Sequence, residues 1–251
     1  MGSSDEERYA KARTDRRAKV DAVLQSKSQR KIVVAGPGTG KTFLFKEILK
    51  NKNNSLTLTF VNSLVEDLSL DLCGLSEVKT LHGFARSVMA KASSNVRVFP
   101  KLSKVIGEDA EILKGQKIDF DSLFHNRDDK NEHIPFYKRR KLIYQHYGFT
   151  DLIYAAVLYL ELKTKRIPAF DQVLVDEFQD FNQLEVSLID LLASKSPIVI
   201  AGDDDQSLYH FKDASPIHIR ERYGDKNKEY ESFNLPHCSR CTSVRPSSSR
   251  S

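Results

Sequence analysis

The sequence has few of the features that mark secreted or membrane proteins. Its three cysteines among 251 residues are too few for a disulfide framework, and no apolar amino-terminal stretch resembles a signal peptide. The most apolar run, residues 152–162, contains Tyr159 and Glu161 and is far shorter than the roughly 20 residues that cross a bilayer. These absences predict a cytoplasmic protein without a membrane partner.

What the sequence does contain is an ordinary globular composition with a basic excess. Hydrophobic residues make up 40% of the chain and the formal net charge is +5, so the chain can bury the core of one or two domains. A positive balance fits contact with phosphates or nucleic acid, although many solvated surfaces carry the same excess without a partner. Charge alone therefore leaves the partner open.

Apolar runs alternate with amphipathic stretches along much of the chain. The apolar runs predict strands at residues 31–35, 56–61, 172–175 and 198–201. Helical spacing of apolar residues predicts helices at residues 42–50, 63–70, 81–91 and 182–192. Continuous apolar strands imply burial on both faces. The alternation predicts an α/β fold, with a parallel sheet flanked by helices.

Other stretches depart from this alternation. Residues 1–30 are dense in charge and are expected to form a charged helical lead-in. Residues 92–168 contain no convincing core strand, and we expect an inserted helical subdomain there. The Ser-rich stretch at residues 244–251 has a composition that cannot form a core, and we expect it to be disordered.

The most specific motif is the phosphate-binding loop AGPGTGKT at residues 35–42. An apolar strand runs into a glycine-rich turn and then into a helix, which is the context that this motif requires. Glycines let the loop curl so that backbone amides point at phosphates, and the helix amino terminus adds its positive dipole. Lys41 would reach the β- and γ-phosphates of ATP, and the Thr42 hydroxyl would ligate magnesium. The predicted nucleotide-binding residues of the loop are Gly36, Pro37, Gly38, Thr39, Gly40, Lys41 and Thr42.

A pair of carboxylates follows a later apolar strand, in the segment VLVDE at residues 173–177. Asp176 ends the strand, where we expect it beside the phosphate loop of a neighbouring strand, holding magnesium. Glu177 would turn to the cleft and accept a proton from the attacking water. A carboxylate pair taken alone is as often a capped strand end. The phosphate loop upstream favours the catalytic interpretation.

Two further motifs complete a family pattern: DEFQD at residues 176–180 and AGDDDQSLY at residues 201–209. Together with the phosphate loop they resemble the UvrD/Rep-like superfamily 1 DNA helicases, as do LTFVNS at residues 58–63 and TLHGF at residues 80–84. The resemblance implies an amino-terminal, P-loop RecA-like ATPase domain with an inserted helical subdomain. It also implies an ATP-dependent DNA helicase or translocase that uses ATP and magnesium. The RecA-like part would comprise residues 31–91 and 169–235.

The resemblance also implies roles for individual residues. Gln206 would sense the γ-phosphate, and Gln179 would help order the same cleft. The residues that would contact single-stranded or partly duplex DNA are Phe60, Asn62, His82, Tyr209 and Phe211. Aromatic rings provide sequence-tolerant stacking platforms for unpaired bases. The alternative for Phe60, Phe84 and Phe211 is that they are core residues.

The sequence also departs from the family pattern. Residues 17–30 lack the Q-x-x-A-V pattern whose glutamine reads adenine. The segment LPHCSRC at residues 235–241 looks like the beginning of a second motor domain, with Arg240 as a γ-phosphate contact, but Ser239 stands where a tyrosine is expected. Residues 236–251 would then be the start of that domain and a tail. We expect slow hydrolysis without the second domain, because an arginine finger is worth about 10³- to 10⁵-fold in turnover.

These departures leave alternatives to a working motor. One is a module that binds ATP and single-stranded DNA without cycling, or an inactive fragment, and another is a protein partner that supplies the second motor domain. A P-loop kinase is a further rival, which DEFQD and DDDQS disfavour. His237, Cys238 and Cys241 are too few for a closed zinc site. The basic run at residues 138–141 is either a grip on DNA or a solvated helix face.

Overall fold

The computed structural model describes residues 3–36, 38–60, 62–93, 95–203, 217–223 and 229–235; the side chains of residues 3–13, 62 and 63 are not among those described. Six strands form one sheet in the order β3-β2-β4-β5-β1-β6, and every pairing is parallel. The strands are β1 (Arg30–Ala35), β2 (Ser55–Thr59), β3 (Glu77–Thr80), β4 (Gln172–Val175), β5 (Ile198–Gly202) and β6 (Glu231–Leu235).

The four expected strands are confirmed as β1, β2, β4 and β5, and the α/β parallel architecture with them. The sequence patterns missed β3 and β6. Both are edge strands, and their residues are mostly exposed or half-buried. An edge strand needs no continuous apolar run, because it is not covered on all sides as a central strand is. The segments EVKT and ESFNL therefore carry little strand signal.

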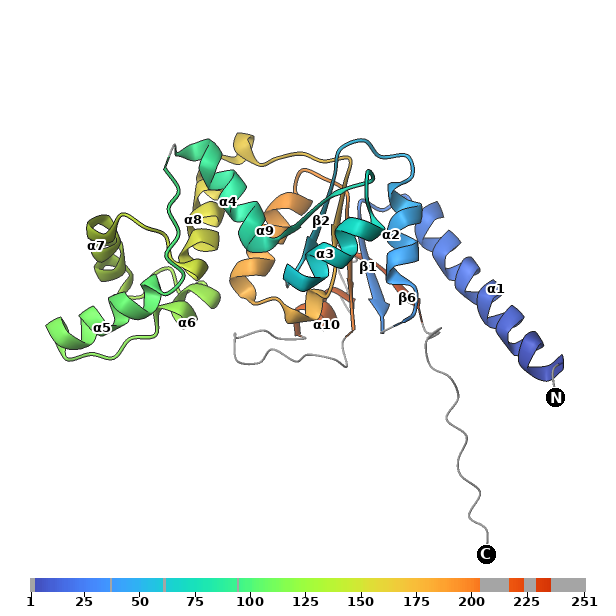
Figure 1. Cartoon of the computed structure of the whole chain (residues 1–251), viewed down its shortest axis with the longest axis horizontal. Coiled ribbons are helices and arrows are strands. Elements are labelled where there is room, and N and C mark those ends of the chain that lie inside the picture. The colour runs from blue at the N-terminus through green and yellow to red at the C-terminus, as the bar shows by residue number, and fades with distance from the viewer. Residues whose placement is uncertain are drawn as a thin grey trace, which may run out of the picture.

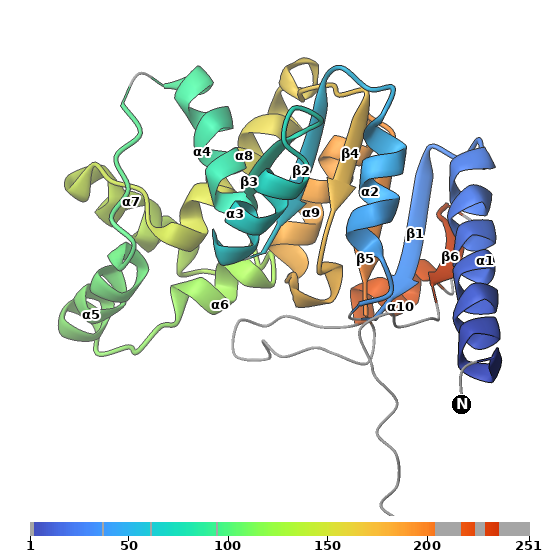
Figure 2. The same ribbon diagram turned by 45° about the vertical axis from the view of Figure 1, so that its right-hand side comes forward.

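Helices cover both faces of the sheet (Figures 1 and 2). The helices are α1 (Ser3–Gln25), α2 (Lys41–Leu49), α3 (Asn62–Asp71), α4 (Leu81–Ala92), α5 (Leu102–Lys114), α6 (Phe120–His125), α7 (Ile134–Tyr144), α8 (Phe149–Leu162), α9 (Gln183–Ala193) and α10 (Ile217–Tyr223), with short 3₁₀ turns η1 (Thr164–Arg166) and η2 (Phe178–Asp180). The four helices expected around the sheet are confirmed as α2, α3, α4 and α9. None of the described helices combines the length and apolar character that a bilayer crossing requires.

Successive side chains of a strand point to opposite faces of the sheet. Alternate residues of these strands therefore belong to two separate apolar clusters, one on each face. On one face, Ile32, Val173 and Ile200 pack with α4, α8 and α9. On the other, Val33 and Leu174 pack with α1, α2 and α3. Through Val20 and Val23, which are fully buried, the last turns of α1 belong to this second cluster.

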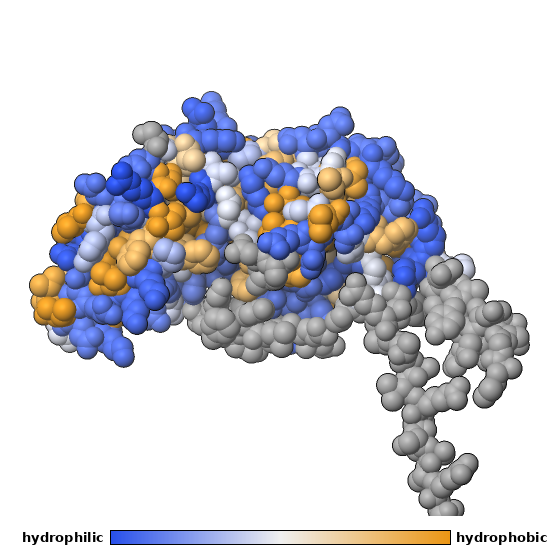
Figure 3. Space-filling model, in the orientation of Figure 1, coloured by the Kyte–Doolittle hydropathy of each residue, from blue (hydrophilic) through white to orange (hydrophobic). Residues whose placement is uncertain are grey.

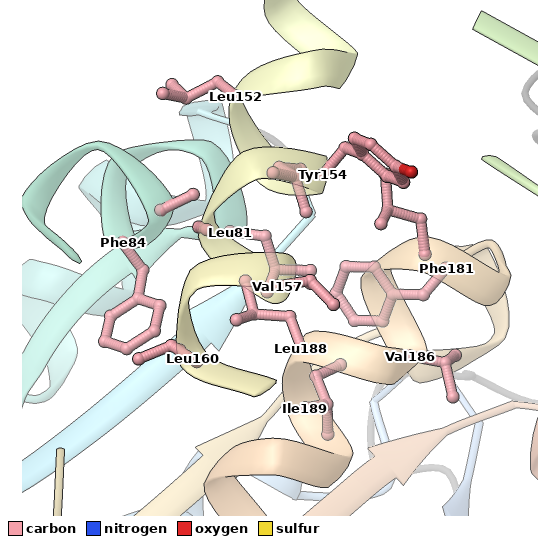
Figure 4. Packing of buried hydrophobic residues seen from close by; sticks show 14 of the residues in the cluster. Leu81, Phe84, Leu152, Tyr154, Val157, Leu160, Phe181, Val186, Leu188 and Ile189 are labelled. Carbon is pink, nitrogen blue, oxygen red and sulfur yellow. The ribbon is translucent and has the colours of Figure 1, made fainter. Parts of the chain in front are cut away.

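The first cluster continues from the sheet into the helices at residues 102–162. Figure 4 shows its centre, where Leu81 and Phe84 of α4 meet Val157 and Leu160 of α8, with Leu188 of α9 beneath them. The sheet and these helices therefore share one hydrophobic core. At the far end, over α5 and α7, apolar side chains reach the surface (Figure 3), and the exposed ones are Ile112, Leu113, Leu142 and Ile143.

Half of the basic run at residues 138–141 is engaged in ion pairs with these helices. Arg140 pairs with Asp109 at 2.7 Å, and Lys141 pairs with Asp151, which is 1% exposed. Burial raises the pKa of Asp151 in spite of Lys141, and burial lowers the pKa of Lys141. Desolvation thus outweighs the attraction within this pair. Since two of its four cations are paired internally, the run does not form a continuous grip for DNA.

Removing one partner of the Lys141–Asp151 pair is expected to lower the stability of the fold more than removing both. Asp151→Asn leaves the Lys141 ammonium buried beside a neutral group, and we expect it to lower the free energy of unfolding by about 3 kcal/mol. The double variant Lys141→Met, Asp151→Asn removes both desolvated charges, and we expect it to recover part of that loss. Urea unfolding of both variants measures the difference. A double variant less stable than Asp151→Asn would contradict the prediction.

Candidate functional site

The phosphate loop joins β1 to α2 at the carboxyl edge of the sheet. Gly38 and Gly40 have φ angles of 70° and 101°, in the left-handed region that glycine adopts at no steric cost. The Thr39 hydroxyl donates a hydrogen bond of 2.8 Å to the Gly36 carbonyl and closes the turn. Gly40 is the N-cap of α2, and no side chain caps this helix. The first amides of α2 are therefore placed to bind an anion.

Lys41, the first residue of α2, points at two carboxylates. Its Nζ lies 2.6 Å from Glu177 Oε1 and 3.5 Å from Asp176 Oδ1. Burial lowers the pKa of Lys41, but these two carboxylates outweigh that effect, so the pKa is raised above its ordinary value. Lys41 thus carries a positive charge that is compensated by Glu177 and Asp176.

The position of this pair corrects one expectation. We expected Asp176 to follow a strand adjacent to that of the phosphate loop, but β5 lies between β4 and β1. The groups meet across the end of β5, which ends at Gly202. A Cβ on Gly202 would lie 2.5 Å from Gln179 Oε1 and 3.2 Å from the Phe178 backbone nitrogen. The absence of a side chain at Gly202 therefore leaves the space beside β5 that Gln179 and the Phe178 backbone occupy.

Gln179 connects Glu177 to the strand between them. Its Nε2 donates to Glu177 Oε2 at 2.8 Å, and its Oε1 accepts from the Asp203 backbone amide at 3.0 Å. Glu177 itself has a φ of 53°, in the left-handed region that residues other than glycine seldom adopt. Such conformations are kept where the surroundings hold them, often at functional sites. The two hydrogen bonds of Gln179 and the ion pair with Lys41 hold the Glu177 side chain in this position.

Asp176 is a buried carboxylate beside Lys41. The residue is 7% exposed, and its Oδ1 makes no hydrogen bond among the described residues. Burial raises its pKa, although Lys41 opposes the shift. The Lys41 ammonium lies 3.5 Å from this oxygen, and a buried carboxylate oxygen is also the kind of ligand that a hard cation prefers. The described residues contain no cluster of three or more His, Cys, Asp or Glu side chains that could hold a metal, so magnesium here would depend on few protein ligands and on phosphate oxygens.

The segments expected to contact DNA lie in different surroundings. Phe60 is half-buried and packs edge to face on Phe181, with ring centroids 5.7 Å apart. Phe84 is 4% exposed, so the core interpretation is confirmed for it. His82 stacks on Phe149, with ring centroids 3.5 Å apart and an interplanar angle of 18°. This pair lines a cavity that also includes Asp119, Asp121 and Glu185. Acidic lining disfavours a phosphate but not the face of a base.

Residues 114–227 match the family described as the UvrD/REP helicase N-terminal domain. This region contains Asp176 and Glu177, which pair with Lys41 of the phosphate loop, and Gln179, which donates to Glu177. The family match and the named relatives support a UvrD/Rep-like helicase N-terminal domain in this chain. This agrees with the resemblance seen in the phosphate loop, DEFQD and DDDQS.

Curated relatives of this UvrD/Rep-like domain are helicases. The ATP-dependent DNA helicase Rep of Buchnera aphidicola is 24% identical over 241 residues, which cover 75% of this chain and 37% of that protein. The putative ATP-dependent DNA helicase YjcD of Bacillus subtilis is 34% identical over 33% of this chain and 12% of its own length. An ATP-dependent helicase/nuclease protein of Lactiplantibacillus plantarum is 41% identical over 22% of this chain and 5% of its own. The chain thus spans little more than a third of the first relative and far less of the others.

Several predicted site residues of the UvrD/Rep-like domain lie outside the described residues. These are Pro37, Gln206, Tyr209, Phe211 and Arg240, together with His237, Cys238 and Cys241. Asn62 begins α3, but its side chain is not described. The described site residues that the structure brings together are Lys41, Asp176, Glu177 and Gln179.

Sequence reasoning missed three parts of the site. Gly202 and the Asp203 amide were overlooked because a glycine at a strand end has many explanations, and a backbone amide carries no sequence signal. Phe149 was missed because its contact with His82 joins residues far apart in the chain. A small residue at the end of β5, directly before the acidic run of DDDQS, was the available signal for Gly202.

Proposed function

We propose that this chain binds ATP with magnesium at the phosphate loop and hydrolyses it as the amino-terminal motor domain of an ATP-dependent DNA helicase or translocase. The observation that carries the proposal is the meeting of Lys41 with Asp176 and Glu177 across the end of β5. The names of the curated relatives support the DNA substrate. In such a motor this chain would form the side of the nucleotide cleft that binds ATP.

Exchange of ion pairs at Lys41 is central to this proposal. With the site as described, Lys41 holds Glu177 at 2.6 Å. A nucleotide in the loop would attract Lys41 to its β- and γ-phosphates and so release the Glu177 carboxylate. The released carboxylate is then free to orient the attacking water and accept its proton. Gln179 would keep Glu177 close to this position through its bond to Oε2.

Asp176 and Thr42 would hold magnesium. The buried Asp176 Oδ1 supplies an oxygen whose neighbour among the described cations is the Lys41 ammonium at 3.5 Å, and Thr42 stands at the start of α2 beside Lys41. Magnesium, when bound, neutralises charge that develops on the phosphate oxygens. We propose that Gln206 and Arg240 contact the γ-phosphate, as the family resemblance implies.

The proposed DNA contacts are Phe60, Asn62, His82, Tyr209 and Phe211. Of these, His82 has the clearest structural support, because it already stacks on another ring, that of Phe149. Stacking of rings on bases is sequence-tolerant and contributes about 1 to 3 kcal/mol per base. Single-stranded or partly duplex DNA is the expected partner, and a protein that supplies a second motor domain would complete the cleft.

The test is steady-state ATP hydrolysis by the purified chain, with and without single-stranded DNA, beside Lys41→Ala as the control. Turnover that DNA stimulates and that Lys41→Ala lacks supports a motor domain. Tight binding of ATP without turnover would select the non-cycling module instead. Failure of the chain to bind ATP would reject the proposal.

A further inference from the structure

Helix α1 brings an arginine onto the phosphate loop. Val20 and Val23 anchor the carboxyl-terminal half of α1 in the core beside α2 (Figure 1). Arg16 lies one turn before Val20 and therefore on the same face of the helix. A Cβ on Gly40 would lie 3.5 Å from Arg16 Cδ, 3.8 Å from Nε and 4.0 Å from one terminal nitrogen. The arginine side chain thus lies along the loop at the residue that precedes Lys41.

The Nε of Arg16 lacks a partner among the described residues, whereas the neighbouring cations Arg17 and Lys41 are paired. The Arg16 Nε is also shielded from solvent. The next residue, Arg17, pairs with Asp21 at 3.0 Å and with Glu47 at 3.7 Å. Lys41, on the other side of Gly40, pairs with Glu177. A shielded donor without an acceptor costs free energy, and arginine cannot relieve that cost by losing its proton.

We propose that Arg16 is a phosphate-contacting residue of the nucleotide site, supplied by the amino-terminal helix. The inference rests on the proposed binding of ATP and adds a residue to it. Loop amides cradle the α- and β-phosphates, whereas the loop lysine reaches toward the γ-phosphate. Gly40 belongs to the loop, and Arg16 lies beside it. Arg16 is therefore positioned to contact the α- or β-phosphate. A guanidinium donates several hydrogen bonds in a fixed fork that matches phosphate oxygens.

The experiment compares binding of ATP and of ADP, each with magnesium, by calorimetry. Arg16→Met keeps most of the side-chain stem and removes the charge. Loss of a charge-assisted hydrogen bond raises Kd by about 10- to 100-fold. We expect this increase for ATP and for ADP. Lys19→Met is the matched control, because Lys19 is an exposed cation on the same helix, and its Kd should equal that of the unmodified chain.

Two further measurements separate the possible failures. Without nucleotide, the thermal midpoint of Arg16→Met should equal or exceed that of the unmodified chain; a clear drop would indicate a structural role and contradict the proposal. Unchanged Kd values for Arg16→Met, with binding lost in Lys41→Ala, would refute the role of Arg16 and leave the nucleotide site intact. If Lys41→Ala bound ATP as well as the unmodified chain, the proposed function itself would fail.

Discussion

Replacement of Glu177 by glutamine is expected to lower ATP turnover by about 10²- to 10⁴-fold, the usual contribution of a positioned general base. Glutamine keeps the length and planar shape of the side chain but has no carboxylate to accept the proton. Gln179 can still bond to the remaining carbonyl oxygen, so the local geometry should survive. The loss therefore reports on chemistry rather than on folding.

The same variant should bind ATP at least as tightly as the unmodified chain. Lys41 Nζ lies 2.6 Å from Glu177 Oε1, and a nucleotide must compete with this ion pair for Lys41. The glutamine at position 177 carries no charge and no longer competes with the nucleotide for Lys41. Asp176 remains as a partner of Lys41. Calorimetry of ATP binding beside steady-state hydrolysis measures both effects. Weaker binding in Glu177→Gln would show that the pair supports the site instead of competing with its ligand, and turnover equal to that of the unmodified chain would remove Glu177 from the mechanism.

Substitution of Gly202 by valine is expected to abolish nucleotide binding and to destabilise the fold. A Cβ at this position would lie 2.5 Å from Gln179 Oε1 and 2.9 Å from Ile219 Cδ1, distances at which a neighbour must shift. Moving Gln179 breaks its bonds to Glu177 and to the Asp203 amide. Overpacking of this kind costs about 1 to 3 kcal/mol. Urea unfolding and ATP binding measure the two consequences.

Gly83→Ala is the matched control for Gly202→Val. A Cβ on Gly83 would lie 3.4 Å from Thr80 Oγ1, which is ordinary contact, and the residue lies within α4. Alanine is favoured over glycine in a helix by about 0.5 to 1 kcal/mol, so this variant should be as stable as the unmodified chain or slightly more so. If Gly202→Val bound ATP normally, the close approach across β5 would not be required for the site.

Local patterns in the sequence were sufficient for much of this protein. The strand, glycine-rich turn and helix of the phosphate loop are adjacent in the chain, so their order alone predicts the loop and the place of Lys41. The four central strands were predicted because burial on both faces demands continuous apolar residues. Their flanking helices were predicted because one apolar face repeats every three to four residues. The edge strands β3 and β6 are not buried on both faces and have no continuous apolar run, so the same pattern could not identify them.

Only the tertiary structure decided which distant residues meet. The order of strands places β5 between the phosphate loop and Asp176, and no local pattern encodes which strands become neighbours. Pairing of Lys41 with Glu177, stacking of His82 on Phe149 and the approach of Arg16 to Gly40 join segments that are 24 to 136 residues apart. Such contacts arise from the packing of whole elements on the sheet, whereas the sequence by itself specifies the elements and the chemistry that each one carries.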